Sequence, residues 1–127
     1  MGDSRLYLIN GEGIRQVTVD HSWVLEQVAQ GVLTHDQART HPLRNVVTRA
    51  IGAAPDLNVD ITSHDMAVGD ILLMCSDGLS GMVLDADLER LVRENADPKT
   101  TAEVLIAEAN AHGGEDNITV LIIKRDE

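Results

Sequence analysis

The stretch Ile71-Leu72-Leu73-Met74-Cys75-Ser76-Asp77-Gly78-Leu79 decides the fold. Residues 71–76 are apolar on both faces of an extended chain, which is typical of a central β-strand that is covered on both sides. Asp77 and Gly78 then indicate a turn where this strand ends. The strand fixes the direction of the Asp77 carboxylate, but the edge of the sheet leaves that carboxylate within reach of water and metal ions.

A second acidic motif, Gly113-Gly114-Glu115-Asp116-Asn117, precedes another apolar strand, which is predicted over residues 118–124. Asp3 similarly precedes a predicted strand over residues 5–9. If the strand before Asp77 runs antiparallel to the other two strands, the three aspartates lie along one edge of the sheet.

Carboxylates gathered at one edge of a sheet indicate a site for a hard metal ion. Mg²⁺ and Mn²⁺ prefer oxygen ligands and keep several waters, so a few carboxylates on a fixed backbone suffice. The predicted ligands are Asp77, Asp116 and Asp3. The spacing alone leaves an alternative open, in which Asp77 and Asp116 only form turns, because Asp-Gly and Asp-Asn are common turn pairs.

The remaining sequence predicts an α+β domain in which helices cover a sheet. The other expected elements are a hairpin over residues 5–19, helices over 22–30, 43–51, 85–95 and 97–112, a short helix that begins at the capping box Thr34-His35-Asp36-Gln37, and an edge strand over 57–63. The helix over 43–51 rests on apolar residues that recur at i, i+3, i+4 and i+7.

The composition fits one small domain and excludes several classes of partner. The 127 residues include 10 basic and 21 acidic side chains, and the net charge of −11 argues against binding to nucleic acids or anionic membranes. No apolar run approaches the roughly 20 residues of a membrane span, and no signal peptide is visible. Cys75 is the only cysteine, which excludes an internal disulfide and favours a buried thiol in a reducing compartment. We therefore expect a cytoplasmic protein.

Five short motifs occur in the order found in one known family, and together they cover essentially the whole chain. They are Gly2-Asp3-Ser4-Arg5-Leu6-Tyr7, Thr18-Val19-Asp20-His21-Ser22, His41-Pro42-Leu43-Arg44-Asn45 through Arg49-Ala50-Ile51-Gly52, Cys75-Ser76-Asp77-Gly78-Leu79, and Gly114-Glu115-Asp116-Asn117-Ile118-Thr119. The chain therefore resembles the bacterial type-2C, metal-dependent protein serine/threonine phosphatases.

The resemblance implies a fold and a metal site. The fold is an antiparallel β-sandwich of the α+β class, flanked by helices. Asp77 and Asp116 would match aspartates that hold a binuclear Mg²⁺ or Mn²⁺ centre. Asp3 would match an aspartate that joins the aspartate of the serine-aspartate-glycine motif in binding a weaker third metal. Residues from about 20 to 52 resemble the mobile flap that lies beside the active site in this family.

The resemblance also implies a reaction, and no catalytic residue beyond the metal ligands. A metal-activated water would attack phosphoserine and phosphothreonine in substrate proteins, without a covalent phosphoenzyme. The domains of this family are much longer than this chain. Their N-terminal half carries the Asp-Gly motif that bridges both metals and the arginine that binds the substrate phosphate, and neither has a counterpart in these 127 residues.

Residues 1–127 are therefore interpreted as the C-terminal part of a phosphatase domain that is incomplete at its N-terminus. The chain would then be a fragment, a truncated gene product or one partner of a split protein. Its expected partners are phosphoproteins, together with either a missing N-terminal half or a second copy of itself. The alternative function is that of a non-catalytic, phosphatase-like half-domain that acts through protein–protein contacts.

A few further residues are weaker candidates. The basic residues Arg39, Arg44 and Arg49 could face a phosphopeptide, although solvated helix faces explain them equally well. The histidines do not have the spacing of a zinc site, and among them only His41 is a candidate for catalysis. Asn117 could orient Asp116 or simply form the turn before the last strand.

Overall fold

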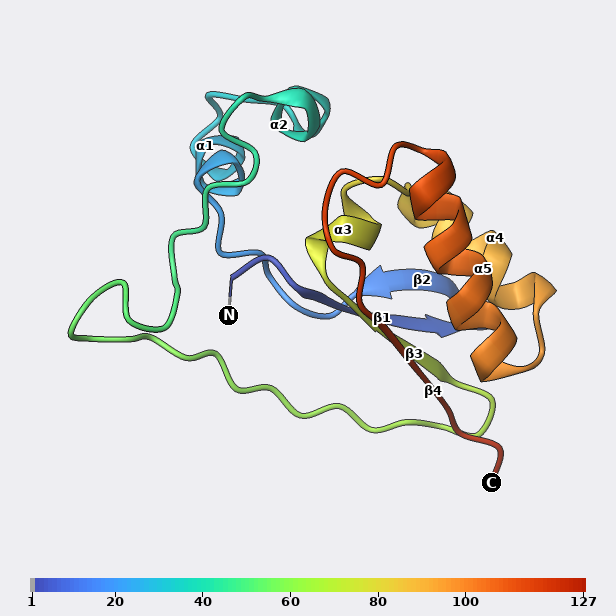
Figure 1. Ribbon diagram of the computed structural model, residues 1–127. Coiled ribbons are helices and arrows are strands. Elements are labelled where there is room, and N and C mark those ends of the chain that lie inside the picture. The colour runs from blue at the N-terminus through green and yellow to red at the C-terminus, as the bar shows by residue number, and fades with distance from the viewer. Residues whose placement is uncertain (1) are drawn as a thin grey trace. The chain divides into compact units, whose positions relative to one another are not determined.

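The computed structural model describes residues 2–127 and divides them into two compact units. The sheet unit comprises Ser4–Thr18 and His64–Glu127. The helical unit comprises Val19–Ser63 together with Gly2 and Asp3. In Figure 1 the helical unit runs from light blue to green, and the sheet unit contains all four labelled strands.

The sheet unit is built on a four-stranded antiparallel sheet in the order β2-β1-β3-β4. The strands are β1 (Arg5–Asn10), β2 (Gly13–Gln16), β3 (Ile71–Cys75) and β4 (Val120–Lys124). In the register, Arg5 lies opposite Cys75, and Cys75 lies opposite Val120. The start of β1, the end of β3 and the start of β4 therefore share one end of the sheet. This confirms the predicted antiparallel arrangement of the strand before Asp77.

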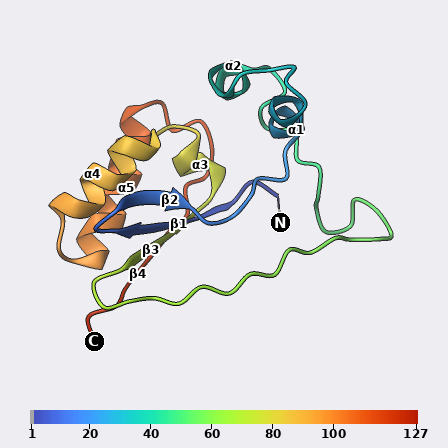
Figure 2. The same cartoon turned by 180° about the vertical axis from the view of Figure 1, so that it is seen from behind.

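Helices cover one face of this sheet. They are α3 (Asp77–Ser80), α4 (Asp85–Glu94) and α5 (Pro98–Ala111). Because α4 contacts β2 and α5 contacts β4, the two longer helices reach both edge strands from the same side (Figures 1 and 2). None of the helices in residues 2–127 has the length and apolar character that a membrane span requires.

A local sequence signal explains where helix α5 begins. Asp97 is the N-cap of α5, and its carboxylate accepts the backbone N–H of Thr100 at 3.0 Å. This hydrogen bond lowers the pKa of Asp97, and Pro98 follows at a position where a missing N–H is harmless. The helix predicted over 85–95 is α4, whose first residue is Asp85 and whose N-cap position is occupied by Leu84 without a capping side-chain hydrogen bond.

The core lies between the sheet and its helices and is mostly aliphatic. Its fully buried large side chains are Tyr7, Ile9, Leu73, Leu79, Val83, Leu88, Val92 and Leu105. The Tyr7 hydroxyl donates to Asp85 Oδ1 at 2.9 Å and accepts from Arg5 Nη1 at 2.8 Å. Burial raises the pKa of Tyr7 far above its ordinary value. This one buried aromatic residue therefore ties β1 to the start of α4 through its polar atom.

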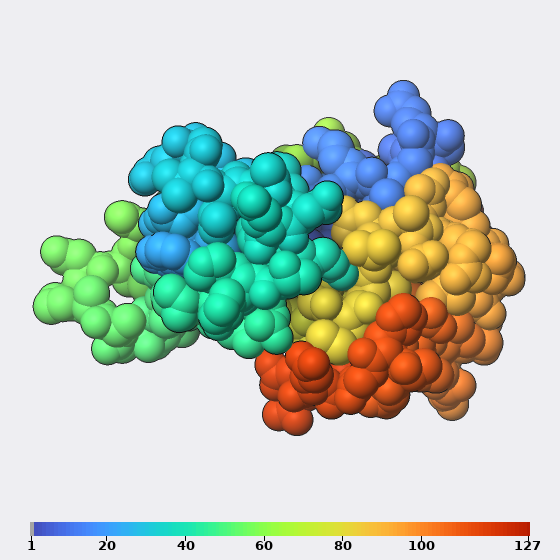
Figure 3. All heavy atoms as spheres, turned by 90° about the horizontal axis from the view of Figure 1, so that it is seen from above, coloured from blue at the N-terminus to red at the C-terminus, as the bar shows by residue number. Residues whose placement is uncertain are grey.

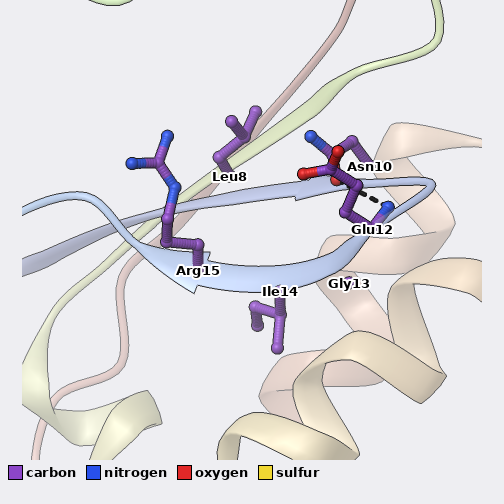
Figure 4. Close-up of a pocket in the computed structure, with 6 residues that line it drawn as sticks. All are labelled: Leu8, Asn10, Glu12, Gly13, Ile14 and Arg15. Carbon is purple, nitrogen blue, oxygen red and sulfur yellow. Dashed lines mark hydrogen bonds between the residues drawn. The ribbon is translucent and has the colours of Figure 1, made fainter.

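The opposite face of the sheet carries two rows of aliphatic side chains that no helix of the sheet unit covers. One row is Leu6, Met74 and Leu121, and the other is Leu8, Leu72 and Ile123. Met74, Leu121 and Ile123 are 46%, 48% and 44% exposed. Figure 4 shows the change of face at the hairpin, where Leu8 and Arg15 point to one side and Ile14 points to the other.

The α+β class, with an antiparallel sheet and outer helices, is thus confirmed. Residues 2–127 contain a single sheet, so the second sheet of the predicted sandwich has no counterpart among the described residues. The apolar rows on the open face are the side chains that such a second sheet would bury.

The helical unit contains two short helices, α1 (Trp23–Ala29) and α2 (His35–Thr40). The Ser22 hydroxyl caps α1 by accepting the Leu25 N–H at 3.3 Å. The predicted capping box at α2 is confirmed, because Thr34 and Gln37 satisfy each other's backbone N–H groups.

Two predicted elements are wrong. Residues 43–51 form turns rather than a helix, because their backbone pairs with residues 21–23: Trp23 N donates to Val46 O, and Thr48 N donates to His21 O. Residues 57–63 form no strand, since they have no ladder partner. The apolar period in 43–51 therefore does not mark a buried stripe, and Ile51 is 84% exposed.

We predict that the 127-residue chain self-associates through its open sheet face. Each large aliphatic side chain left in water forgoes about 1.5–3 kcal/mol, and unpaired edge strands offer further contacts. Sedimentation velocity should show dimers or larger species, and the double substitution Met74→Lys with Ile123→Lys should shift the chain toward the monomer.

Val68→Lys is the matched control, because Val68 is also exposed but lies in a turn outside the sheet. This variant should associate like the wild type. A monodisperse wild-type monomer with a cooperative melt above about 55 °C would contradict the prediction.

Candidate metal centre

Asp77 occupies the point where β3 gives way to helix α3. Ser76 is the N-cap of this one-turn helix, and Asp77 is its first residue. Leu79, two positions later, is completely buried in the core, and Gly81 N donates to Asp77 O at 2.8 Å. The Asp77 backbone is therefore fixed from both sides, and its side chain remains partly exposed.

Asp116 lies on the loop between α5 and β4. Gly113 and Gly114 have φ values of +126° and +54°, which a residue with a side chain rarely adopts, so this tight exit from α5 depends on glycine. The Asp116 side chain is exposed, and its Oδ1 accepts the backbone N–H of Asn117 at 2.7 Å. That bond fixes one carboxylate oxygen within the turn. It also supports the reading of Asn117 as a turn residue.

The two acidic segments are packed directly against each other. The Ser76 hydroxyl accepts the Thr119 N–H at 3.0 Å and donates to Asn117 O at 3.2 Å. A Cβ added to Gly78 would lie only 2.1 Å from Asn117 O. Figure 3 shows the loop before β4, in red, against the α3 segment, in yellow. We call this contact the acidic junction, formed by residues 76–78 and 116–119.

Asp3, the third predicted ligand, belongs to the helical unit. The backbone O of Gly2, next to it, accepts the His21 N–H at 2.7 Å. Within residues 2–127, no group of three or more His, Cys, Asp or Glu side chains is arranged to hold a metal ion. The metal-binding roles of Asp77, Asp116 and Asp3 stay predictions.

The donor atoms at the acidic junction suit a hard cation. Asp77 and Asp116 offer carboxylate oxygens at positions that water can reach, as Mg²⁺ and Mn²⁺ require. The neighbouring Cys75 is buried, and burial raises the pKa of its thiol to about 11. This thiol therefore stays protonated at neutral pH and is a poor nucleophile.

In the helical unit, a three-residue ionic network holds the extended segment that contains Asp60. Asp60 Oδ2 lies 2.8 Å from His21 Nε2, and Asp60 Oδ1 accepts from Arg49 Nη1 at 2.9 Å. The hydrogen bond to His21, followed by that to Arg49, lowers the pKa of Asp60. Buried His21 Nδ1 has no partner among the described residues, so we assign the ring proton to Nε2, which faces the carboxylate.

Sequence reasoning missed this network because His21 and Asp60 are 39 residues apart and belong to no spacing pattern. His41, the one histidine considered for catalysis, is engaged locally: its Nδ1 accepts the Leu43 N–H at 3.0 Å, and its ring lies 5.2 Å from that of Trp23. The Arg44 side chain donates to the His41 carbonyl at 3.2 Å. Two of the three basic candidates, Arg44 and Arg49, thus make contacts within the helical unit.

A pocket of the sheet unit lies away from the acidic junction. It sits at the β1–β2 hairpin, and Figure 4 shows its lining residues Leu8, Asn10, Glu12, Gly13, Ile14 and Arg15. Asn10 pairs with Gly13 at the turn, which is the opposite end of β1 from Arg5. The pocket therefore contributes nothing to the candidate metal centre.

Known proteins similar to this chain are phosphatases. Residues 18–126 match the family described as Stage II sporulation protein E (SpoIIE). The chain is 40% identical over 126 residues to the serine/threonine phosphatase stp of Listeria monocytogenes, covering 99% of this chain and 50% of that protein. It is 38% identical over 127 residues to protein phosphatase PhpP of Streptococcus pneumoniae, covering 100% and 52%. The chain thus spans about half the length of the curated relatives it matches.

Solved structures that are similar to this chain include serine/threonine phosphatases as well. The serine/threonine phosphatase PstP/Ppp of Mycobacterium tuberculosis matches with a TM-score of 0.93 at 32% identity, covering 100% of this chain and 53% of that chain. The S. agalactiae serine/threonine phosphatase matches with a TM-score of 0.90 at 36% identity, covering 98% and 52%. A structure of the PstP catalytic domain in complex with two manganese ions matches with a TM-score of 0.85 at 31% identity, covering 96% and 50%.

We predict that Gly78→Ala disrupts the acidic junction. The new methyl group would overlap Asn117 O, and overpacking of this kind costs about 1–3 kcal/mol. Urea denaturation should show the corresponding loss in the free energy of unfolding. Gly11→Ala is the control, because nothing lies within 4 Å of its added Cβ and its φ is not positive. A Gly78→Ala protein as stable as the wild type would contradict the close approach.

We also predict that the Asp60 network stabilises the helical unit in a pH-dependent way. Because the pKa of Asp60 is lowered on folding, its contribution is complete above the ordinary value of 3.8 and is lost as pH falls through the folded value. Fluorescence of Trp23, the only tryptophan, reports unfolding of this unit in urea. The urea midpoint of the wild type should exceed that of Asp60→Asn at neutral pH, and the difference between the two midpoints should narrow as the pH is lowered below 3.8. A difference that does not change between neutral pH and acid would refute the assignment.

Proposed function

The chain belongs to the family of SpoIIE and type-2C serine/threonine phosphatase domains, and from this premise we propose that it forms the metal-binding part of a protein phosphatase. Its substrates would be proteins that carry phosphoserine or phosphothreonine. The acidic junction is the observation that carries the proposal, because it joins the two segments that hold Asp77 and Asp116.

In this proposal Asp77 and Asp116 are ligands of Mg²⁺ or Mn²⁺, and Asp3 binds a third, weaker ion. Two metal ions, when bound, supply a water of lowered pKa and stabilise the displacement at phosphorus. The chain's own part is to hold the ligands: α3 fixes the Asp77 backbone, and the Asn117 amide fixes Asp116 Oδ1. The PstP catalytic domain, solved with two manganese ions, supports this choice of metal.

Binding of the substrate phosphate is not assigned to Arg5. Its guanidinium donates to the buried Tyr7 hydroxyl at 2.8 Å, so this arginine contributes to the core of the sheet unit. We assign residues from about 20 to 52, which belong to the helical unit, to the flap of the phosphatase domain, and we place the protein in the cytoplasm. The open apolar face of the sheet supports a further partner, either a complementary half-domain or a second copy of this chain.

The open face also fits the alternative function of a phosphatase-like half-domain that acts through protein contacts. The two functions differ in one respect that experiment can separate. Only the enzymatic function requires Asp77 and Asp116 to take part in hydrolysis once the sandwich is complete.

The test is hydrolysis of p-nitrophenyl phosphate with Mn²⁺ present. The 127-residue chain alone should show negligible turnover, since two carboxylates leave most of a six-ligand shell to water. Joined to the N-terminal half of the Listeria phosphatase stp, it should gain activity that Asp116→Asn abolishes, because the loss of one ligand disrupts the shared-water geometry.

Asp126→Asn is the matched control in the same fusion, because Asp126 is 77% exposed near the C-terminus. It should leave the gained activity unchanged. Robust turnover by the chain alone, or full activity in the Asp116→Asn fusion, would contradict the proposed roles of Asp77 and Asp116 as metal ligands. A folded fusion without any activity would favour the non-catalytic function.

A further inference from the structure

Ser76 joins the acidic junction in a way that a strand residue alone could not. Its backbone N–H donates to Thr119 O at 3.0 Å, which extends the β3–β4 ladder by one pair beyond Cys75 and Val120. In a regular antiparallel pair, Thr119 N–H would donate back to the Ser76 carbonyl. Here it donates to the Ser76 hydroxyl instead, at 3.0 Å.

The exchange leaves the Ser76 carbonyl available for another bond. That carbonyl accepts the Leu79 N–H at 3.1 Å, which is the first turn of α3. Because the Ser76 carbonyl accepts from the α3 turn, the ladder bond from the Thr119 N–H goes to the hydroxyl. The hydroxyl therefore allows β3 to become α3 within a single residue, and Asp77 is placed directly at the end of the strand.

The same hydroxyl reaches the second acidic segment. It donates to Asn117 O at 3.2 Å, so one side chain holds both Thr119 and Asn117, on either side of Ile118. Asn117 in turn donates its backbone N–H to the Asp116 carboxylate. A short chain of hydrogen bonds thus joins the two acidic segments: the Ser76 hydroxyl, next to Asp77, bonds to Asn117, and the Asn117 backbone amide bonds to the Asp116 carboxylate.

We propose that Ser76 is a positioning residue that sets the spacing and orientation of Asp77 and Asp116 for a shared metal ion. This rests on the proposed function, because it assumes that both carboxylates bind metal. Alanine at position 76 would leave the Thr119 N–H without its acceptor and Asn117 O without its donor, whereas threonine would keep the hydroxyl.

The experiment follows Mn²⁺ binding to the ¹⁵N-labelled chain by the paramagnetic loss of amide signals. In the wild type, the amides of residues 77–78 and 116–117 should broaden together at one Mn²⁺ concentration. Ser76→Ala should need about five-fold more Mn²⁺ for the same broadening. Ser76→Thr should behave as the wild type, because its hydroxyl can replace the original one.

Two further variants test whether a general loss of stability could explain the effect of Ser76→Ala. Ser76→Cys keeps the shape of the side chain but offers only a weak acceptor, so it should lie between wild type and Ser76→Ala. Asp97→Ala removes the N-cap of α5. This N-cap lies at the opposite end of the 14-residue helix from the loop that leads to the acidic junction, and the two helix ends are about 20 Å apart. This substitution should lower stability but leave the joint broadening of the two segments intact.

Asp77→Asn and Asp116→Asn separate this inference from the function beneath it. If both substitutions weaken Mn²⁺ binding but Ser76→Ala and Ser76→Cys match the wild type, Ser76 is not a positioning residue and the metal site stands. If neither aspartate substitution changes the broadening, the metal site and the role of Ser76 are both refuted.

Discussion

The Ser76 hydroxyl replaces a backbone carbonyl in the β3–β4 ladder, and the geometry of the acidic end of the sheet depends on this exchange. At the joint between β3 and α3, the Ser76 carbonyl accepts the Leu79 N–H of the helix. The Ser76 hydroxyl accepts the Thr119 N–H of the ladder. Gly78 then permits the loop before β4 to approach to a distance that any Cβ would prevent. The hydrogen bonds and the close packing at this end of the sheet therefore both depend on two small residues, Ser76 and Gly78.

The rest of the sheet unit keeps that end rigid. Helices α4 and α5 bury one face of the sheet, and Tyr7 ties β1 to α4 through Asp85. The other face remains apolar and open, in a chain that spans about half the length of its curated relatives. One sheet with a single covered face holds the two proposed metal ligands, Asp77 and Asp116. Burial of the open face against a partner would gain free energy.

Features set by neighbouring residues were predictable from sequence. The N-caps Ser22, Thr34 and Asp97 are local signals, and each accepts the backbone N–H expected of it. The apolar strands β3 and β4 were also predictable, as was the position of Asp77 and Asp116 at their ends. The predicted helix over 43–51 failed because its backbone pairs with residues 21–23, which no local period reveals. Likewise, the contact of Ser76 with Asn117 spans 41 residues, so the motifs indicated the candidate ligands but not the junction that holds their two segments together.

The central claim is that Asp77 and Asp116 act on one metal centre. A crystal structure of the chain grown in Mn²⁺, with anomalous diffraction to locate the ion, tests it most directly. We expect an anomalous peak about 2.1 Å from a carboxylate oxygen of Asp77 and at a similar distance from one of Asp116, with water completing the shell. A manganese ion bound elsewhere in a well-ordered crystal, with both carboxylates free of metal, would contradict it.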